Sequence, residues 1–101
     1  MIADVKRDGS YLQVLDASGK KIAEQRENNV GELVSFTSNF VLCRKDTYYV
    51  TYDFNFKKIA EQRVNNIGEF KNAAGYNMNF QKDSYIVTYD VNFKKISERR
   101  A

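Results

Sequence analysis

The stretch that decides the fold is TYYVTYDFNFKKIAEQR, residues 47–63, which returns as SYIVTYDVNFKKISERR at residues 84–100. These two copies are identical at 12 of 17 positions and lie 37 residues apart. The ending KKIAEQR also occurs 37 residues earlier, at residues 20–26, after a more diverged stretch that begins at Ser10. Self-similarity at a fixed period of this length is typical of repeat architectures. The chain therefore holds a little under three copies of one unit.

Each unit is predicted to form four short β-strands. The Tyr-rich segments, such as residues 84–89, combine aromatic and β-branched side chains, which is strand composition. A turn follows, in which Gly19 of the first copy is free to take a positive φ, and Asn55 and Asn92 are expected to take over that role in the later copies. The charged KKI segment comes next, then an Asn-Asn turn and two more strands. Because no helical period persists over ten residues, the sequence predicts an all-β fold.

The units lie at approximately residues 1–29, 30–66 and 67–101 of a single repeat domain, and the first unit lacks its first strand. The polar KKI strand is expected at the solvent-exposed edge of its sheet, whereas the Tyr-rich strand is apolar on both faces and is expected in the interior. This gradient favours β-propeller-like blades. Three blades are too few to close a ring of about four to eight, and an open stack is expected to leave an apolar face at each end. We therefore expect completion by homo-oligomerisation, with a dimer favoured. The alternatives are a threefold β-prism or a β-trefoil.

The composition excludes several classes of chemistry. The 101-residue chain (11.7 kDa) has no His, Trp or Pro, and Cys43 is its only cysteine. These absences exclude a Ser-His-Asp or Cys-His centre, a His- or Cys-based zinc site and an intrachain disulfide within one chain. Nothing breaks the repeat as a single active site would, so we expect no enzyme activity, no cofactor and no metal. The net charge of +3 permits a polyanion partner without requiring one.

No apolar run is long enough to span a membrane, and the N-terminus lacks the pattern of a signal peptide, so the default expectation is a cytoplasmic protein. The basic residues of the KKI strands share these strands with Glu24, Glu61 and Glu98, which reduce the local field. Nucleic acid is therefore not an expected partner.

Two resemblances involve the same stretch. Residues 69–75, Phe80 and residues 83–90 resemble blades of tachylectin-like and related propellers. They are also similar to the bulb-type mannose-binding lectins of the β-prism fold, whose sugar motif is Q-x-D-x-N-x-V-x-Y. Four residues match this motif in spacing, with Tyr85 in the place of its Asn: Gln81, Asp83, Val87 and Tyr89. The second copy keeps less of it, and the chain lacks the Trp that those lectins place in each unit's last strand. Both resemblances imply carbohydrate binding.

The chain is therefore predicted to be a non-enzymatic, lectin-like binding module, and the alternative is a structural, self-assembling repeat protein with no small ligand. The candidate ligand-binding residues are Gln81, Asp83 and Tyr85 in the last unit and Arg44, Asp46 and Tyr48 in the middle one. Phe54, Phe56 and Phe93 lie in turns, where aromatic residues are unusual. They are expected either to pack over the neighbouring unit or to form a rim that binds a partner chain or a ligand.

Overall fold

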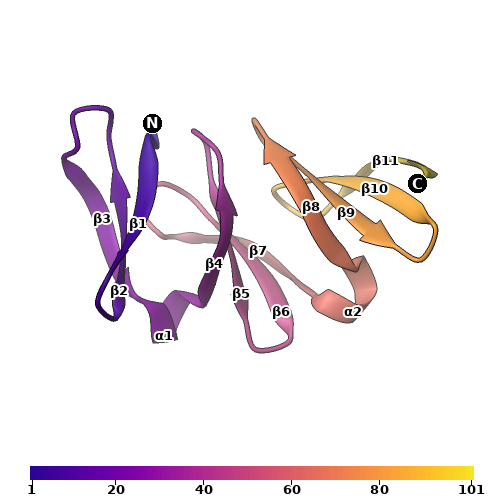
Figure 1. Cartoon of the computed structure of the whole chain (residues 1–101), viewed down its shortest axis with the longest axis horizontal. Coiled ribbons are helices and arrows are strands. Elements are labelled where there is room, and N and C mark those ends of the chain that lie inside the picture. Colours follow the sequence, from indigo (N-terminus) through magenta and orange to yellow (C-terminus); the bar gives the residue numbers. More distant parts are fainter.

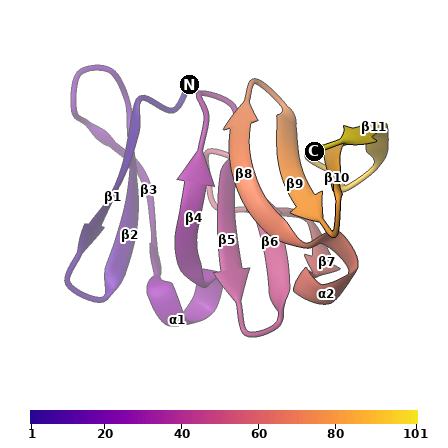
Figure 2. The same cartoon turned by 45° about the vertical axis from the view of Figure 1, so that its right-hand side comes forward.

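The chain forms three antiparallel sheets that follow one another along the sequence. A computed structural model describes all 101 residues. The first sheet holds β1 (Asp4–Asp8), β2 (Tyr11–Leu15) and β3 (Lys21–Arg26); the middle sheet holds β4 (Glu32–Phe36), β5 (Val41–Lys45), β6 (Tyr48–Tyr52) and β7 (Lys58–Arg63); the last sheet holds β8 (Glu69–Ala74), β9 (Asn77–Lys82), β10 (Tyr85–Asp90) and β11 (Lys95–Arg100). The sheets lie side by side in chain order (Figure 1, Figure 2). The predicted all-β fold is confirmed, and none of the sheets closes into a barrel.

Each sheet is a meander, and the last strands of the first two sheets, β3 and β7, lead into the first strand of the next sheet. The connections are the one-turn helices α1 (Glu27–Val30) and α2 (Val64–Ile67), which stand where the sequence predicts Asn-Asn turns. A glycine with positive φ ends each helix, at Gly31 and Gly68. Val30 and Ile67 are buried, so each short helix also contributes a side chain to the core beside it.

The middle sheet is buried on both faces. On β6, Val50 and Tyr52 belong to a core shared with the first sheet, whereas Tyr49 faces a second core shared with the last sheet. Alternate residues of a strand point to opposite faces, which explains why the Tyr-rich segment of this unit is apolar throughout. The two cores are separate, so the arrangement differs from both alternatives to a propeller. A threefold prism would gather three sheets around one core, and a trefoil would need a closed barrel.

The expectation of an apolar face at each end is wrong. In the first sheet, Lys6 and Gln13 occupy the positions that Cys43 and Val50 hold in the middle sheet, and they lie on its outward face. Gln13 Nε2 donates a hydrogen bond of 2.8 Å to Glu24 Oε2 on the same face. The open face of the first sheet is therefore polar, and burial against a further sheet is not needed.

The outward face of the last sheet is polar as well. Asn79 stands where the middle sheet has the fully buried Leu42. Its amide links three strands, because Asn79 Nδ2 donates to Asn72 Oδ1 (2.7 Å) and Thr88 Oγ1 donates to Asn79 Oδ1 (2.5 Å). Ile96, which is 54% exposed, is the large apolar residue that this face leaves uncovered.

The turn after each Tyr-rich strand is held by its aspartate. Asp53 Oδ1 accepts the backbone N–H groups of Asn55 (2.8 Å) and Lys57 (2.9 Å), and the first and last units repeat this arrangement. The expectation that an Asn takes the positive φ of Gly19 is wrong. Phe56 and Phe93, both at φ 60°, occupy the equivalent position. Their rings are buried against the preceding sheet, which outweighs the local preference for glycine.

Candidate functional site

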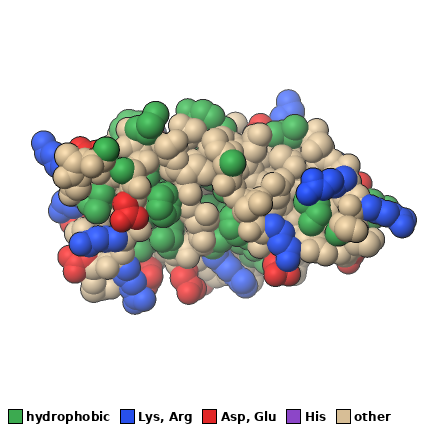
Figure 3. All heavy atoms as spheres, turned by 45° about the horizontal axis from the view of Figure 1, so that its top comes forward, with side chains coloured by type: hydrophobic (Ala, Val, Ile, Leu, Met, Phe, Trp, Pro, Cys, Tyr) green, Lys and Arg blue, Asp and Glu red, His purple; other side chains and the backbone are tan.

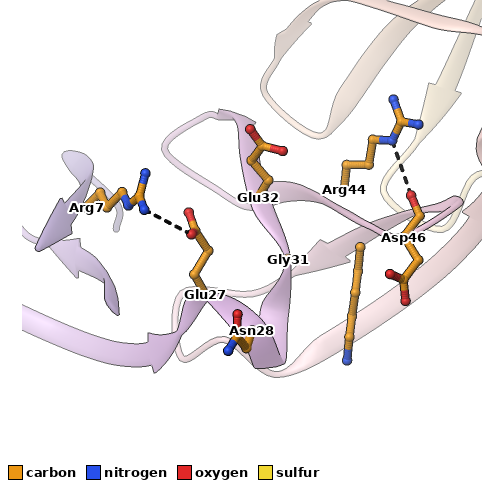
Figure 4. A pocket seen from close by; sticks show the side chains of 8 residues that line it. Arg7, Glu27, Asn28, Gly31, Glu32, Arg44 and Asp46 are labelled. Carbon is orange, nitrogen blue, oxygen red and sulfur yellow. Dashed lines mark hydrogen bonds and ion pairs between the residues drawn. The ribbon is translucent and has the colours of Figure 1, made fainter. Parts of the chain in front are cut away.

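A polar cleft of about 310 Å³ opens between the first and middle sheets. No apolar side chain lines it. Its lining residues are Arg7 from β1, Glu27 and Asn28 from α1, Gly31 and Glu32 where α1 leads into β4, and Arg44, Lys45 and Asp46 where β5 ends in a turn (Figure 4). Residues of both charges from four separate elements therefore border one hollow.

Gly31 lets the chain pass close to the end of β5, and so sets the floor of the cleft. It has φ 99°, and a Cβ atom added there would lie 2.6 Å from the backbone oxygen of Arg44. Gly68 makes the same approach to Gln81, where the corresponding distance is 2.3 Å. Distances under 3.0 Å are not tolerated by a Cβ, and a positive φ is itself costly for other residues. The recurring Gly at this position is therefore a requirement of backbone packing.

Hydrogen bonds and an ion pair hold the cationic side chains of the cleft. Arg7 Nη2 lies 3.4 Å from Glu27 Oε1. Arg44 Nε donates to the backbone oxygen of Asp46 (3.3 Å), and Lys45 Nζ donates to the backbone oxygen of Asn29 (3.1 Å). Three basic residues stand against three acidic ones in the lining, which leaves the cleft with no net formal charge. Such a site offers donors and acceptors together rather than a field of one sign.

The structure brings only part of the predicted site together. Arg44 and Asp46 line the cleft, whereas Gln81 and Asp83 lie at the equivalent place on the last sheet. At this place between the middle and last sheets no cavity opens beside Gln81 and Asp83, and Gln81 Nε2 donates to the backbone oxygen of Asp83 (3.4 Å). Asp46 and Asp83 adopt positive φ values of 56° and 57° in tight hairpins, the role that Gly9 has in the first unit.

The tyrosines of the predicted site do not line the cleft. The Arg63 guanidinium lies 5.4 Å from the ring centroid of Tyr48, and that of Arg100 lies 5.9 Å from the ring of Tyr85. Tyr11 and Arg26 form the same pair in the first unit, at 5.5 Å. A cation over an aromatic face is a favourable contact. These pairs recur because Tyr and Arg are directly opposite on neighbouring strands.

The turn phenylalanines divide into two groups. Phe56 is 6% exposed and belongs to the first core, and Phe93 is 8% exposed and belongs to the second, as the packing alternative for these residues predicts. The rim alternative is therefore wrong for both. Phe54 is 44% exposed and borders a second hollow of about 210 Å³ with Met1 and Tyr76. Figure 3, turned so that the top of Figure 1 comes forward, shows apolar side chains in separate patches among polar atoms, with Lys and Arg toward both ends and along the lower edge.

Two titratable groups are buried beneath the cleft region. Burial raises the pKa of the Cys43 thiol to about 12 and that of the Tyr52 hydroxyl to about 12. The Tyr52 hydroxyl donates to the backbone oxygen of Val30 (2.9 Å), which ties the middle sheet to α1. Cys43 is fully buried and stays a neutral thiol, so it acts as a small hydrophobic residue of the first core.

The chain matches no protein-family model and no curated protein sequence. No helix in the structure has both the length and the apolar character needed to cross a membrane.

Sequence reasoning missed most of the cleft. It did not single out Glu27, Asn28, Glu32 or Lys45, because each reads as a solvated residue in a turn or at a strand end. One signal was available. Glu27 is replaced by Val64 in the next unit, and Arg44 is replaced by Gln81. At these two positions, the contact between the first and middle sheets has charged residues, and the contact between the middle and last sheets has uncharged ones. A departure from the repeat marks the junction at which the structure forms a cavity.

Proposed function

We propose that the protein is a non-enzymatic binding module that takes a carbohydrate in the cleft between the first and middle sheets. The presence of carboxylate, guanidinium and amide residues around one open hollow carries this proposal. Carboxylates accept and guanidinium groups donate hydrogen bonds, so together they complement the hydroxyl groups of a sugar, which do both. The balance of charge in the lining favours a neutral, polar ligand over an anion.

The size of the cleft suits a small ligand. Its volume of about 310 Å³ lies at the lower end of the range of roughly 300–1,000 Å³ that is usual for ligand pockets. No aromatic ring lines it, so affinity would come from hydrogen bonds alone. We therefore expect weak binding, near the millimolar level that corresponds to about 4 kcal/mol.

Titration calorimetry or NMR with mannose, galactose, fucose and N-acetylated sugars tests this proposal. Asp46→Gly removes a lining carboxylate without straining a position that has φ 56°. We expect it to weaken binding by about tenfold, which corresponds to about 1.4 kcal/mol. Asp83→Gly changes the equivalent turn of the last sheet, where no cleft forms, and should leave binding unchanged. If no sugar binds with a Kd below about 10 mM, or if both variants behave alike, the carbohydrate proposal is wrong.

Assembly into a ring of identical chains is a second proposal. Two features support it: the three sheets pack in chain order through two separate cores, and β3 and β7 each lead into the first strand of the next sheet, which is also how the blades of a propeller follow one another. Two chains would supply six sheets, joined through end faces that are mostly polar. Light scattering at micromolar concentration would show about twice 11.7 kDa for such a dimer. A mass near 11.7 kDa would contradict it.

A further inference from the structure

The first sheet has a free edge at the position where the other two sheets carry their first strand. β4 pairs with β5 and β8 pairs with β9, but β1 pairs only with β2. The backbone N–H of Val5 points away from β2 and donates to the Asp4 carboxylate at 2.9 Å. Because N–H groups two residues apart on a strand point the same way, the N–H of Arg7 also faces this edge. β1 therefore presents, on this edge, backbone groups that no strand pairs with and that could accept another strand.

The two complete sheets show what fits such an edge. Both first strands run antiparallel to their neighbour and begin with a glutamate. Glu32 lies opposite Arg44, and Glu69 lies opposite Gln81. Arg7 is the equivalent residue on β1, and its side chain is 65% exposed beside the cleft. An incoming strand that begins with an acidic residue would meet an arginine, as β4 does.

The flank of this edge is apolar. Leu33 and Phe36 of β4 are half-buried and pack against the first core. Their counterparts in the last sheet are Phe70 and Ala73 of β8, which pack against the second core. Val34 of β4 packs against this same core. Val34 is the third residue of its strand, and β4 contacts β8. By the same geometry, an apolar third residue of an incoming strand would lie against Leu33 and Phe36.

We propose that the free edge of β1 binds an extended peptide segment of another polypeptide, which adds a fourth, antiparallel strand to the first sheet. The segment would have an acidic first residue opposite Arg7 and an apolar third residue against Leu33 and Phe36. The segment can be only about as long as β1, which has five residues. Beyond β1, the backbone N–H of Ile2 already donates to the backbone oxygen of Ser38, so the edge is no longer free there. Main-chain hydrogen bonds would supply the affinity, and the two side chains would supply the selectivity.

The chain itself supplies the probe and its matched control. A blocked peptide of residues 31–37, GELVSFT, carries the acidic first and apolar third residues of β4. A blocked peptide of residues 68–74, GEFKNAA, has lysine in the third place. We expect the first peptide, titrated into the ¹⁵N-labelled full chain, to shift the amide signals of Val5 and Arg7 and to slow their hydrogen exchange. The second should bind at least about threefold more weakly, since it buries no apolar side chain there.

A charge reversal tests the proposed pairing. Arg7→Glu should weaken the GELVSFT peptide by at least about threefold, and a GKLVSFT peptide should recover binding to this variant. Retained dispersion of the amide spectrum would show that the variant is folded.

Three outcomes would overturn the proposal. The first is no shift of Val5 and Arg7 at millimolar GELVSFT. The second is equal binding of both peptides. The third is a response confined to β5, which would mean that the peptide replaces β4 in the middle sheet. None of these measurements involves a sugar, so the carbohydrate proposal stands or falls separately.

Discussion

Phe56 combines a buried ring with a left-handed backbone conformation that is costly for a bulky side chain and free of that cost for glycine, so substituting it separates two opposing contributions to stability. The residue has φ 60° and is 6% exposed. Its ring packs 5.9 Å from that of Tyr52, edge to face, within the core between the first and middle sheets. Gly19, its counterpart in the first unit, has no atom within 4 Å of where a Cβ would stand, since no sheet precedes it.

The magnitudes follow from these two features. Truncating a buried Phe to Ala typically destabilises by about 3–5 kcal/mol, and Phe56→Ala keeps the unfavourable left-handed backbone, which costs an L-residue about 1–2 kcal/mol. Phe56→Gly loses the same ring but removes this conformational cost. We therefore expect both variants to be destabilised, and the glycine variant to be the more stable of the two by about 1 kcal/mol, although glycine is the smaller residue.

Urea denaturation followed by circular dichroism measures these differences, with Phe54→Ala as the control. Phe54 lies in the same turn and is 44% exposed, so its truncation should change the free energy of unfolding by less than about 0.5 kcal/mol. An alanine variant at Phe56 as stable as the parent would show that the ring does not contribute to the core. A glycine variant less stable than the alanine one would refute the argument from backbone strain.

Three further perturbations are expected to have measurable effects. Gly68→Ala should destabilise the protein by more than about 1 kcal/mol in thermal unfolding, because Gly68 has φ 97° and an added Cβ would lie 2.3 Å from the backbone oxygen of Gln81. Gly75→Ala is the control for the loss of a positive-φ glycine alone, because its Cβ would meet no atom within 4 Å. Thr51→Val should lower the free energy of unfolding by about 1–3 kcal/mol, because valine cannot donate the hydrogen bond that the buried Thr51 hydroxyl makes to the backbone oxygen of Val91 (2.6 Å), between the middle and last sheets. An unchanged urea midpoint would contradict this role. The hydrogen bond from the Ser18 hydroxyl and that from the Lys20 backbone N–H lower the pKa of Asp16 below 3.8, so its contribution to stability is present above about pH 4 and is lost as the pH falls through the lowered value. Unfolding measured from pH 6 to pH 2.5 should show a shallower acid loss in Asp16→Ala than in the parent, and parallel curves would argue against the lowered pKa.

Much of the fold could be predicted because its signals are local. The 37-residue period makes residues such as Asp16, Asp53 and Asp90 equivalent, and each holds the same turn because its carboxylate reaches backbone N–H groups two and four residues ahead. Strand composition depends on neighbouring residues only, so the strands were placed to within a few positions. The Asn-Asn turns were the exception, since a single helical turn of four residues has no periodicity to reveal it.

The expected apolar ends failed for a different reason. The departures from the repeat were in the sequence, at Lys6 and Gln13 in the first unit and at Asn79 in the last. Their meaning depends on which face of a strand looks toward a neighbouring sheet, and this direction is known only once the order of the sheets is known.

Local pattern and comparison of the copies are sufficient to identify a β-repeat and to locate its strands, because both signals are contained in the residues themselves. Which turn residue takes the left-handed conformation, Phe56 and Phe93 rather than Asn55 and Asn92, depends instead on how the sheets pack. The gain from burying a ring depends on the sheet that covers it. The same holds for the cleft, whose lining residues come from β1, α1, β4 and β5 and meet only where two sheets are joined.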